Sequence, residues 1–187
     1  MPLDNIDKQI IQALLNKGRE SFNKLKDLTF KSGIEHMSHT GIRKRVAKLK
    51  DSEIMNIQGN LNLNKLQYYF AFIFLELEDY EKVKEIIEAY SDCPRTFLLT
   101  QVTGQFNLIV GVTGKNIDVL HTYLNHCGPT NKKGVLHSEI LFTSNIQIPK
   151  FLPINLFTNI SQEHKCGNRC KKCEAFLCGD CNGCGNF

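Results

Sequence analysis

The sequence predicts an α+β protein in three parts, on the strength of three observations. Residues 1–50 carry apolar side chains at helical spacing and hold eleven Lys or Arg against five Asp or Glu, a net charge of +6. From residue 68 onward, strand and helix patterns alternate in the order βαββαβ. Six of the eight cysteines crowd into the last 22 residues. We therefore expect domains at residues 1–63, 64–150 and 151–187.

Two helices are expected before residue 30. The first, over residues 4–17, is opened by Asp4 with Asp7 and closed by Gly18. Ser21 caps a short second helix. The apolar stripes of these helices are Ile6, Ile10, Ile11, Leu14 and Leu15 in the first, and Phe22, Leu25 and Leu28 in the second.

A basic helix is predicted over residues 37–50. Ile42, Val46 and Leu49 form its apolar stripe, so the opposite face is free to meet a polyanion. Arg and Lys contact phosphates or guanine edges, while Thr and His read other base edges. The predicted contacts to double-stranded DNA are Ser38, His39, Thr40, Arg43, Lys44 and Lys48. A solvated amphipathic helix without a ligand is the alternative.

The segment after the basic helix completes the first predicted domain. Residues 54–58 alternate apolar and polar side chains, as a strand does, and are expected to form a wing. Together with three helices, such a strand makes a winged helix-turn-helix over residues 1–63.

The middle of the chain predicts a ferredoxin-like βαββαβ sandwich. Its first strand, YYFAFIFLEL at residues 68–77, is apolar on both faces, and further strands are expected at 96–103, 106–112 and 135–146. Two intervening helices present Tyr80, Val83, Ile87 and Tyr90, then Ile117, Leu120, His121 and Leu124. Because both helices of this fold cover one sheet face, the other face stays apolar and uncovered. We expect a second copy of the chain to cover it, giving a homodimer.

Residues 3–150 resemble the Lrp/AsnC family of feast/famine transcription regulators. The similarity rests on LDNIDKQIIQALLNKGRESF, on MSHTGIRKRVAKL and on VTGQFNLIVGV, which starts at Val102. The resemblance implies a dimer, with tetramers or octamers built from it, that binds pseudo-palindromic DNA. It also implies a small-molecule effector, commonly an amino acid, near Gly104 and Asn107; Asn107 stands where the family usually has Asp.

The C-terminal cysteines are spaced C-x3-C-x2-C-x4-C-x2-C-x2-C. They are Cys166, Cys170, Cys173, Cys178, Cys181 and Cys184. Pairs at C-x2-C spacing present two sulfurs to one metal, so we expect a bound Zn²⁺. A [4Fe-4S] cluster is the alternative, because the last three cysteines have ferredoxin-like spacing. A tail of free thiols is a third reading. The tail is expected to be separable from both preceding folds.

Other function classes fit the sequence less well. It contains no phosphate-binding loop, no supported Ser-His-Asp arrangement and no paired carboxylates in an apolar segment, so we do not expect an enzyme. With neither a signal peptide nor an apolar run long enough to span a bilayer, a cytoplasmic protein without membrane contact is expected. The prediction is a DNA-binding transcription regulator whose metal-binding tail senses redox or metal state. The alternative is a protein-interaction adaptor that docks through the tail.

Overall fold

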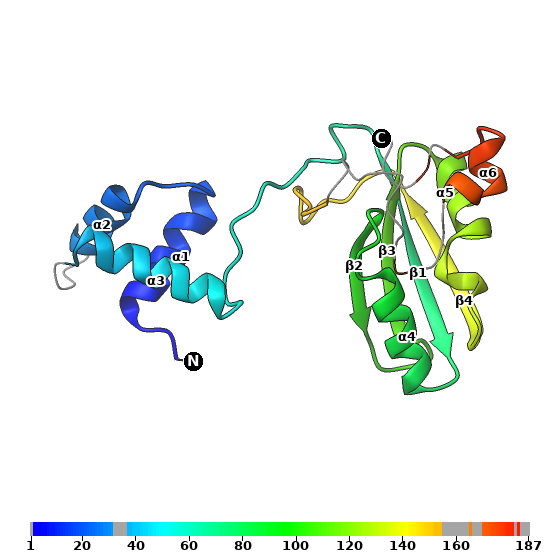
Figure 1. Ribbon diagram of the computed structural model, residues 1–187, viewed down its shortest axis with the longest axis horizontal. Helices are drawn as coiled ribbons and strands as arrows, with labels where there is room; N and C mark the ends of the chain where they lie inside the picture. The colour runs from blue at the N-terminus through cyan, green and yellow to red at the C-terminus, as the bar shows by residue number, and fades with distance from the viewer. Residues whose placement is uncertain (1, 32–36, 155–164, 166–169, 182, 184–187) are drawn as a thin grey trace. The chain divides into compact units, whose positions relative to one another are not determined.

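The computed structural model describes residues 2–31, 37–154, 165, 170–181 and 183. The chain divides into two compact units, residues 1–59 and 60–187 (Figure 1). Cys166, Cys184 and most of the connection at 30–36 lie outside the described residues.

The first unit is a bundle of three helices. They are α1 (Asn5–Lys17), α2 (Phe22–Lys31) and α3 (His39–Asp51). Their apolar stripes meet in one core made of Ile10, Leu14, Leu25, Ile42, Val46 and Leu49. Every one of these residues comes from a predicted apolar stripe, which confirms the helical periodicity for them. Leu15 was also assigned to the stripe of the first helix, and that assignment was wrong, because its side chain is 80% exposed.

Side-chain caps define where α1 and α3 begin. Asp4 and Asp7 form a reciprocal capping box, in which the Asp7 N–H donates to Asp4 Oδ1 at 2.8 Å. Gly18 ends α1 with a φ of 65°, and its N–H donates to the Leu14 carbonyl. At α3, the Ser38 hydroxyl accepts from the Gly41 N–H at 3.1 Å. The Ser38 cap therefore sets the start of the basic helix.

The predicted wing does not form, and that part of the winged helix-turn-helix prediction was wrong. Residues 54–58 contain no strand, and the Ile54 and Met55 N–H groups instead donate to the Leu49 carbonyl behind them. Alternation alone does not make a strand, because a strand also needs a neighbour to pair its backbone groups. The first unit is a helix-turn-helix bundle without a wing strand in its described residues.

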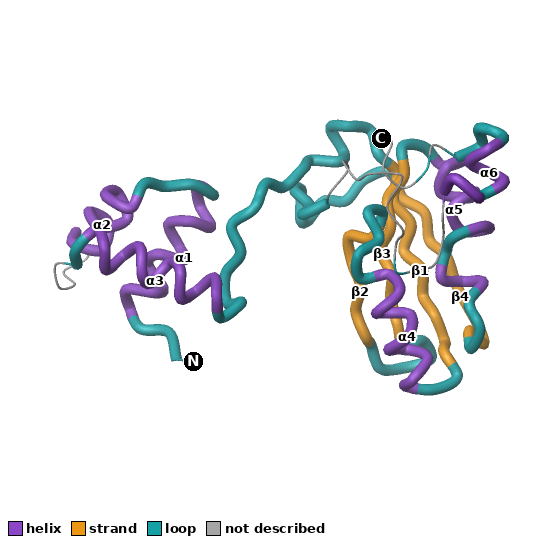
Figure 2. The backbone as a smooth tube through the Cα atoms, in the orientation of Figure 1, coloured by secondary structure: helices purple, strands orange, loops and turns teal. Residues whose placement is uncertain are grey.

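The second unit contains a four-stranded antiparallel sheet. Its elements run β1 (Tyr69–Leu77), α4 (Tyr80–Tyr90), β2 (Thr96–Gln101), β3 (Leu108–Gly114), α5 (Ile117–His126) and β4 (Val135–Thr143). The strands lie in the order β2-β3-β1-β4, so β1 and β3 are central (Figure 2). This order and the alternation with helices are those of the predicted βαββαβ unit.

One face of this sheet packs on both helices, and the other does not. Ile73 and Leu75 of β1 are fully buried in a core with Val83 and Ile86 of α4 and Leu120 of α5. The alternate β1 residues Phe72 and Phe74 are only half-buried and belong to the opposite face. Directly opposite Phe72 on β4, Leu141 is 51% exposed. The open apolar face predicted from the sequence is therefore present.

A short return of the chain covers one end of the open face. Leu61 and Leu152 exchange two backbone hydrogen bonds of 2.9 Å each. Leu152 and Ile154 then pack with Phe70 at the start of β1. Residues 152–154, in the predicted linker, thus contribute to the core of the second unit.

Candidate nucleic-acid interface

The basic face of α3 is exposed as the sequence predicts. Ser38, His39, Thr40, Arg43, Lys44 and Lys48 are all exposed. Ile42, Val46 and Leu49, on the other side of α3, are buried in the three-helix core. Ala47 is also exposed, and its small side chain allows the helix backbone to approach another surface closely. The geometry suits a helix that enters a DNA groove.

Arg45 is the one arginine of α3 that turns inward. Its Nη1 lies 2.6 Å from Asp4 Oδ2 and 2.8 Å from Asp7 Oδ1, so it joins α3 to the capping box of α1. The hydrogen bond from the Asp7 N–H lowers the pKa of Asp4, slight burial opposes this, and Arg45 adds to it. Arg45 therefore positions α3, whereas Arg43 and Lys44 remain available to a ligand.

The start of α2 forms a second part of this surface. The Ser21 hydroxyl accepts from the Lys24 N–H at 3.3 Å, and the Phe22 ring meets the His39 ring edge-on at 5.4 Å. A hollow of about 660 Å³ is lined by Arg19, Glu20, Ser21, Phe22, Asn23 and His39. Arg19, Ser21 and Asn23 are absent from the predicted DNA contacts. The signal that points to them is the cap at Ser21, because a helix N-terminus attracts phosphate.

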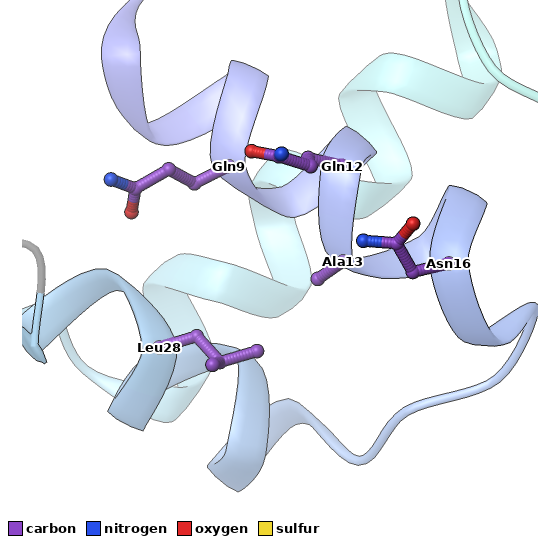
Figure 3. A pocket seen from close by; sticks show the side chains of 5 residues that line it. All are labelled: Gln9, Gln12, Ala13, Asn16 and Leu28. Atoms are coloured by element: carbon purple, nitrogen blue, oxygen red, sulfur yellow. The ribbon is translucent and has the colours of Figure 1, made fainter.

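A smaller hollow lies between α1 and α2 (Figure 3). It measures about 200 Å³ and is lined by Gln9, Gln12, Ala13, Asn16 and Leu28, which carry no charge. None of the six predicted DNA contacts lines it. Its lining therefore supplies no positive charge to attract phosphate.

The predicted effector residues lie in the β2–β3 connection. Gly104 is exposed with a φ of 141°, a conformation that favours glycine. The Asn107 amide is held by Leu77 at the end of β1: its Oδ1 accepts from the Leu77 N–H at 3.0 Å, and its Nδ2 donates to the Leu77 carbonyl at 2.8 Å. Both polar groups of this amide thus join strands, and the second bond requires a donor that Asp lacks.

A polar hollow lies at the opposite end of β1 from Asn107. It measures about 400 Å³ and is lined by Asn64, Gln67, Tyr68, Tyr69, Lys115 and Ser144. Tyr69 pairs with Gly114 at this end of the sheet, whereas Leu75 pairs with Leu108 near Asn107. The structure therefore does not bring Gly104 and Asn107 to this hollow.

The described tail cysteines sit in two tight turns. Cys170 begins the short helix η2 (Cys170–Lys172), while Cys173 and Cys178 flank α6 (Glu174–Leu177). Cys181 Sγ accepts from the Gly183 N–H at 3.4 Å, and Gly183 has a φ of 82°. Within the residues that the structure describes, no three Cys, His, Asp or Glu side chains converge on a metal position. With Cys166 and Cys184 outside those residues, the six-cysteine site stays a prediction.

Comparisons with known proteins point to one group of regulators. The HTH-type transcriptional regulator FL11 of Pyrococcus horikoshii is 25% identical over 156 residues, which cover 82% of this chain and 98% of that protein. AsnC of E. coli matches with a TM-score of 0.64 at 21% identity, over 79% of this chain and 96% of AsnC. The Neisseria meningitidis regulator NMB0573, solved with L-Met, matches with a TM-score of 0.62 at 17% identity, over 79% and 92% of the two chains. No family model matches the chain.

The fold and the exposed helix define the class of protein that the chain resembles. Its fold is that of AsnC, and the similar curated proteins are HTH-type transcriptional regulators and not enzymes. Among the described helices, none is both long and apolar enough to cross a membrane.

Proposed function

We propose that the chain is a sequence-specific DNA-binding transcription regulator of the Lrp/AsnC family. The observation that carries the proposal is the exposed basic face of α3 on a helix whose other side is fixed in a core. Arg43 and Lys44 supply the charge, and His39 and Thr40 supply further donors to base edges. Arg19 and the cap at Ser21 add phosphate contacts at the start of α2.

We expect the regulator to work as a homodimer built on the open sheet face. Within the chain, the Phe72 ring meets the Phe97 ring edge-on and the Phe74 ring meets the Phe106 ring at a tilt, with 5.7 Å between the ring centres in each pair. Leu98 and Leu141 extend this face and are 37% and 51% exposed. A second copy of the same face is a partner of matching chemistry and would hold two helix-turn-helix units for two half-sites. Tetramers or octamers would add further contacts beyond this face.

The C-terminal cysteines are proposed to bind Zn²⁺, with a [4Fe-4S] cluster as the alternative. The positive φ values of Gly179 and Gly183 and the N–H···S bond to Cys181 give the tight turns that two-residue cysteine spacings need around a metal. Protein prepared without oxygen should be colourless and contain zinc. Brown protein with acid-labile sulfide would favour the [4Fe-4S] cluster over zinc. Metal-free protein would contradict both the zinc site and the cluster.

The proposed regulator responds to a small-molecule effector. The Neisseria neighbour was solved with L-Met, whereas the Asn107 amide of this chain is occupied by Leu77. We therefore place no ligand contact on the Asn107 side chain. Gly104 remains an open position beside it.

DNA selection tests the central proposal. Purified full-length protein is incubated with random double-stranded DNA, and bound molecules are recovered and sequenced. The proposal predicts enrichment of one pseudo-palindromic site with half-sites about one helical turn, or a multiple of it, apart. Recovery of DNA without an enriched sequence, or of no DNA, contradicts it and favours the adaptor function.

A further inference from the structure

Arg95 is a buried cation in the sheet domain. It immediately precedes β2, it is 1% exposed, and its side chain is the largest of those fully buried among the described residues. Its backbone carbonyl accepts from the Thr113 N–H at 2.9 Å, which fixes the main chain at this point. A buried guanidinium is tolerated only where carbonyls or other acceptors receive its N–H groups.

One of those acceptors comes from the cysteine-rich tail. Arg95 Nη2 donates to the Gly183 carbonyl at 2.9 Å, across 88 positions of sequence. Nη1 lies 3.4 Å from the Thr113 carbonyl on β3, and Cζ lies 5.9 Å from the centre of the Tyr123 ring on α5. The bond to the tail is therefore shorter than the bond to the sheet.

Gly183 faces the cysteines with its other polar group. Its N–H donates to Cys181 Sγ at 3.4 Å, and the residue is buried. A Cβ added at Gly183 would lie 3.0 Å from the Phe176 ring and 3.6 Å from Cys170 Sγ. Gly183 thus contacts Arg95 through its carbonyl and the Cys181 sulfur through its N–H.

We propose that Arg95 is the docking site of the C-terminal cysteine segment on the sheet domain, with the Gly183 carbonyl as the group it binds. The tail is then not a separable module, as the sequence suggested, but part of the fold around β2, β3 and α5. Removing it takes an acceptor from a buried cation. The next step rests on the proposed metal site: a metal that fixes the turn at Cys181 also fixes the Gly183 carbonyl. Metal binding and stability of the sheet domain are consequently coupled, and the coupling is reciprocal.

A double-mutant cycle tests the docking without metal. The four proteins are the full chain and a chain ending at residue 160, each with Arg95 or with Arg95→Met. Truncation has already removed the contact that Arg95→Met would break. The factor by which Arg95→Met changes the unfolding equilibrium constant should therefore be roughly ten-fold or more larger in the full chain than in the truncated chain. Equal effects in both chain lengths overturn the proposal.

If the truncated chain does not fold, hydrogen exchange of the full chain tests the docking instead. Gly183→Val puts methyl groups against the Phe176 ring and leaves Arg95 itself intact. The proposal predicts faster exchange both in the tail, at residues 170–181, and in β2. Faster exchange in the tail with unchanged exchange in β2 contradicts docking, as does unchanged exchange in both.

Adding zinc separates the docking from the metal site. Zinc content is measured together with the thermal midpoint, for wild type and for Arg95→Met. Zinc binding that raises the midpoint of wild type more than that of Arg95→Met supports the coupling, and an equal rise in both overturns it. If no zinc binds but the cycle is non-additive, the docking stands and the proposed metal function fails.

Discussion

The guanidinium of Arg45 on α3 lies 2.8 Å from the carboxylate of Asp7 on α1. The two side chains are 28% and 11% exposed, so the pair is shielded from water more than a surface ion pair. Neighbouring Arg43 is exposed. Two arginines separated by one residue therefore have different roles: Arg45 sets the position of the helix, and Arg43 faces outward.

Arg45→Ala should lower the stability of the helical unit. The change leaves the Asp7 carboxylate poorly exposed and without its cation, which we expect to cost about 1–3 kcal/mol of unfolding free energy. Arg43→Ala, as the matched control, should change stability by less than about 0.5 kcal/mol. Chemical denaturation followed by circular dichroism measures both. Equal midpoints for the two variants would refute the positioning role of Arg45.

The capping box predicts a dependence of stability on acid. The pKa of Asp4 is lowered in the folded protein by the Asp7 N–H bond, against slight burial and with help from Arg45. The unfolded chain then binds the proton more tightly, so the contribution of Asp4 is present above its ordinary pKa of 3.8 and is lost as the pH falls through the lower folded value. The stability difference between wild type and Asp4→Asn should shrink over that range. A stability difference that stays constant over this pH range would disprove the contribution of the Asp4 carboxylate.

Asn107→Asp should destabilise the sheet domain. A carboxylate can accept from the Leu77 N–H but cannot donate to the Leu77 carbonyl, and it places negative charge against that oxygen. We expect a loss of about 1–3 kcal/mol in unfolding free energy. Asn60→Asp, at an exposed position outside the strands, is the control for the added charge. An unfolding midpoint of Asn107→Asp as high as that of the control would show that the Asn107 amide is not needed for stability.

Leu141→Glu should dissociate the proposed homodimer. Leu141 is exposed on the open face opposite Phe72, so a carboxylate there places a charge in the proposed interface without entering the helix-side core. Light scattering should give half the mass of wild type. Leu15→Glu introduces the same change at an exposed position of α1 and should keep the wild-type mass. If Leu141→Glu also keeps it, the open face is not the dimer interface.

Features set by local periodicity were predictable from the sequence. The stripe of α3 assigns Ile42 to the buried side, and the alternation of β1 places Ile73 and Phe72 on opposite faces of the sheet, because burial follows helix and strand geometry. The caps at Asp4 and Ser38 were equally local. These features fix the three-helix bundle and the antiparallel sheet, and with them the exposure of Arg43 and Lys44.

Features that depend on partners distant in sequence were not predictable. Nothing in the local pattern pairs Arg45 with Asp7, joins Asn107 to Leu77 or brings Gly183 to Arg95, since each contact closes a long loop. The predicted wing did not form for the same reason: residues 54–58 alternate apolar and polar side chains, but no strand among the described residues pairs with them. Conversely, Leu152 and Ile154 lie in a predicted linker and become buried because they pack in one cluster with Leu63, Tyr68 and Phe70.

Affinity for the selected DNA site is the most direct test of the central claim. Fluorescence anisotropy compares wild type with Arg43→Ala and Lys44→Ala at several salt concentrations. Lys8→Ala, an exposed lysine on α1, is the matched control for lost charge. We predict that Arg43→Ala weakens binding by about 1–3 kcal/mol, that Lys44→Ala reduces the salt dependence by about one phosphate contact, and that Lys8→Ala does neither. Unchanged affinity and salt dependence in both α3 variants would contradict the assignment of α3 as the DNA-reading helix.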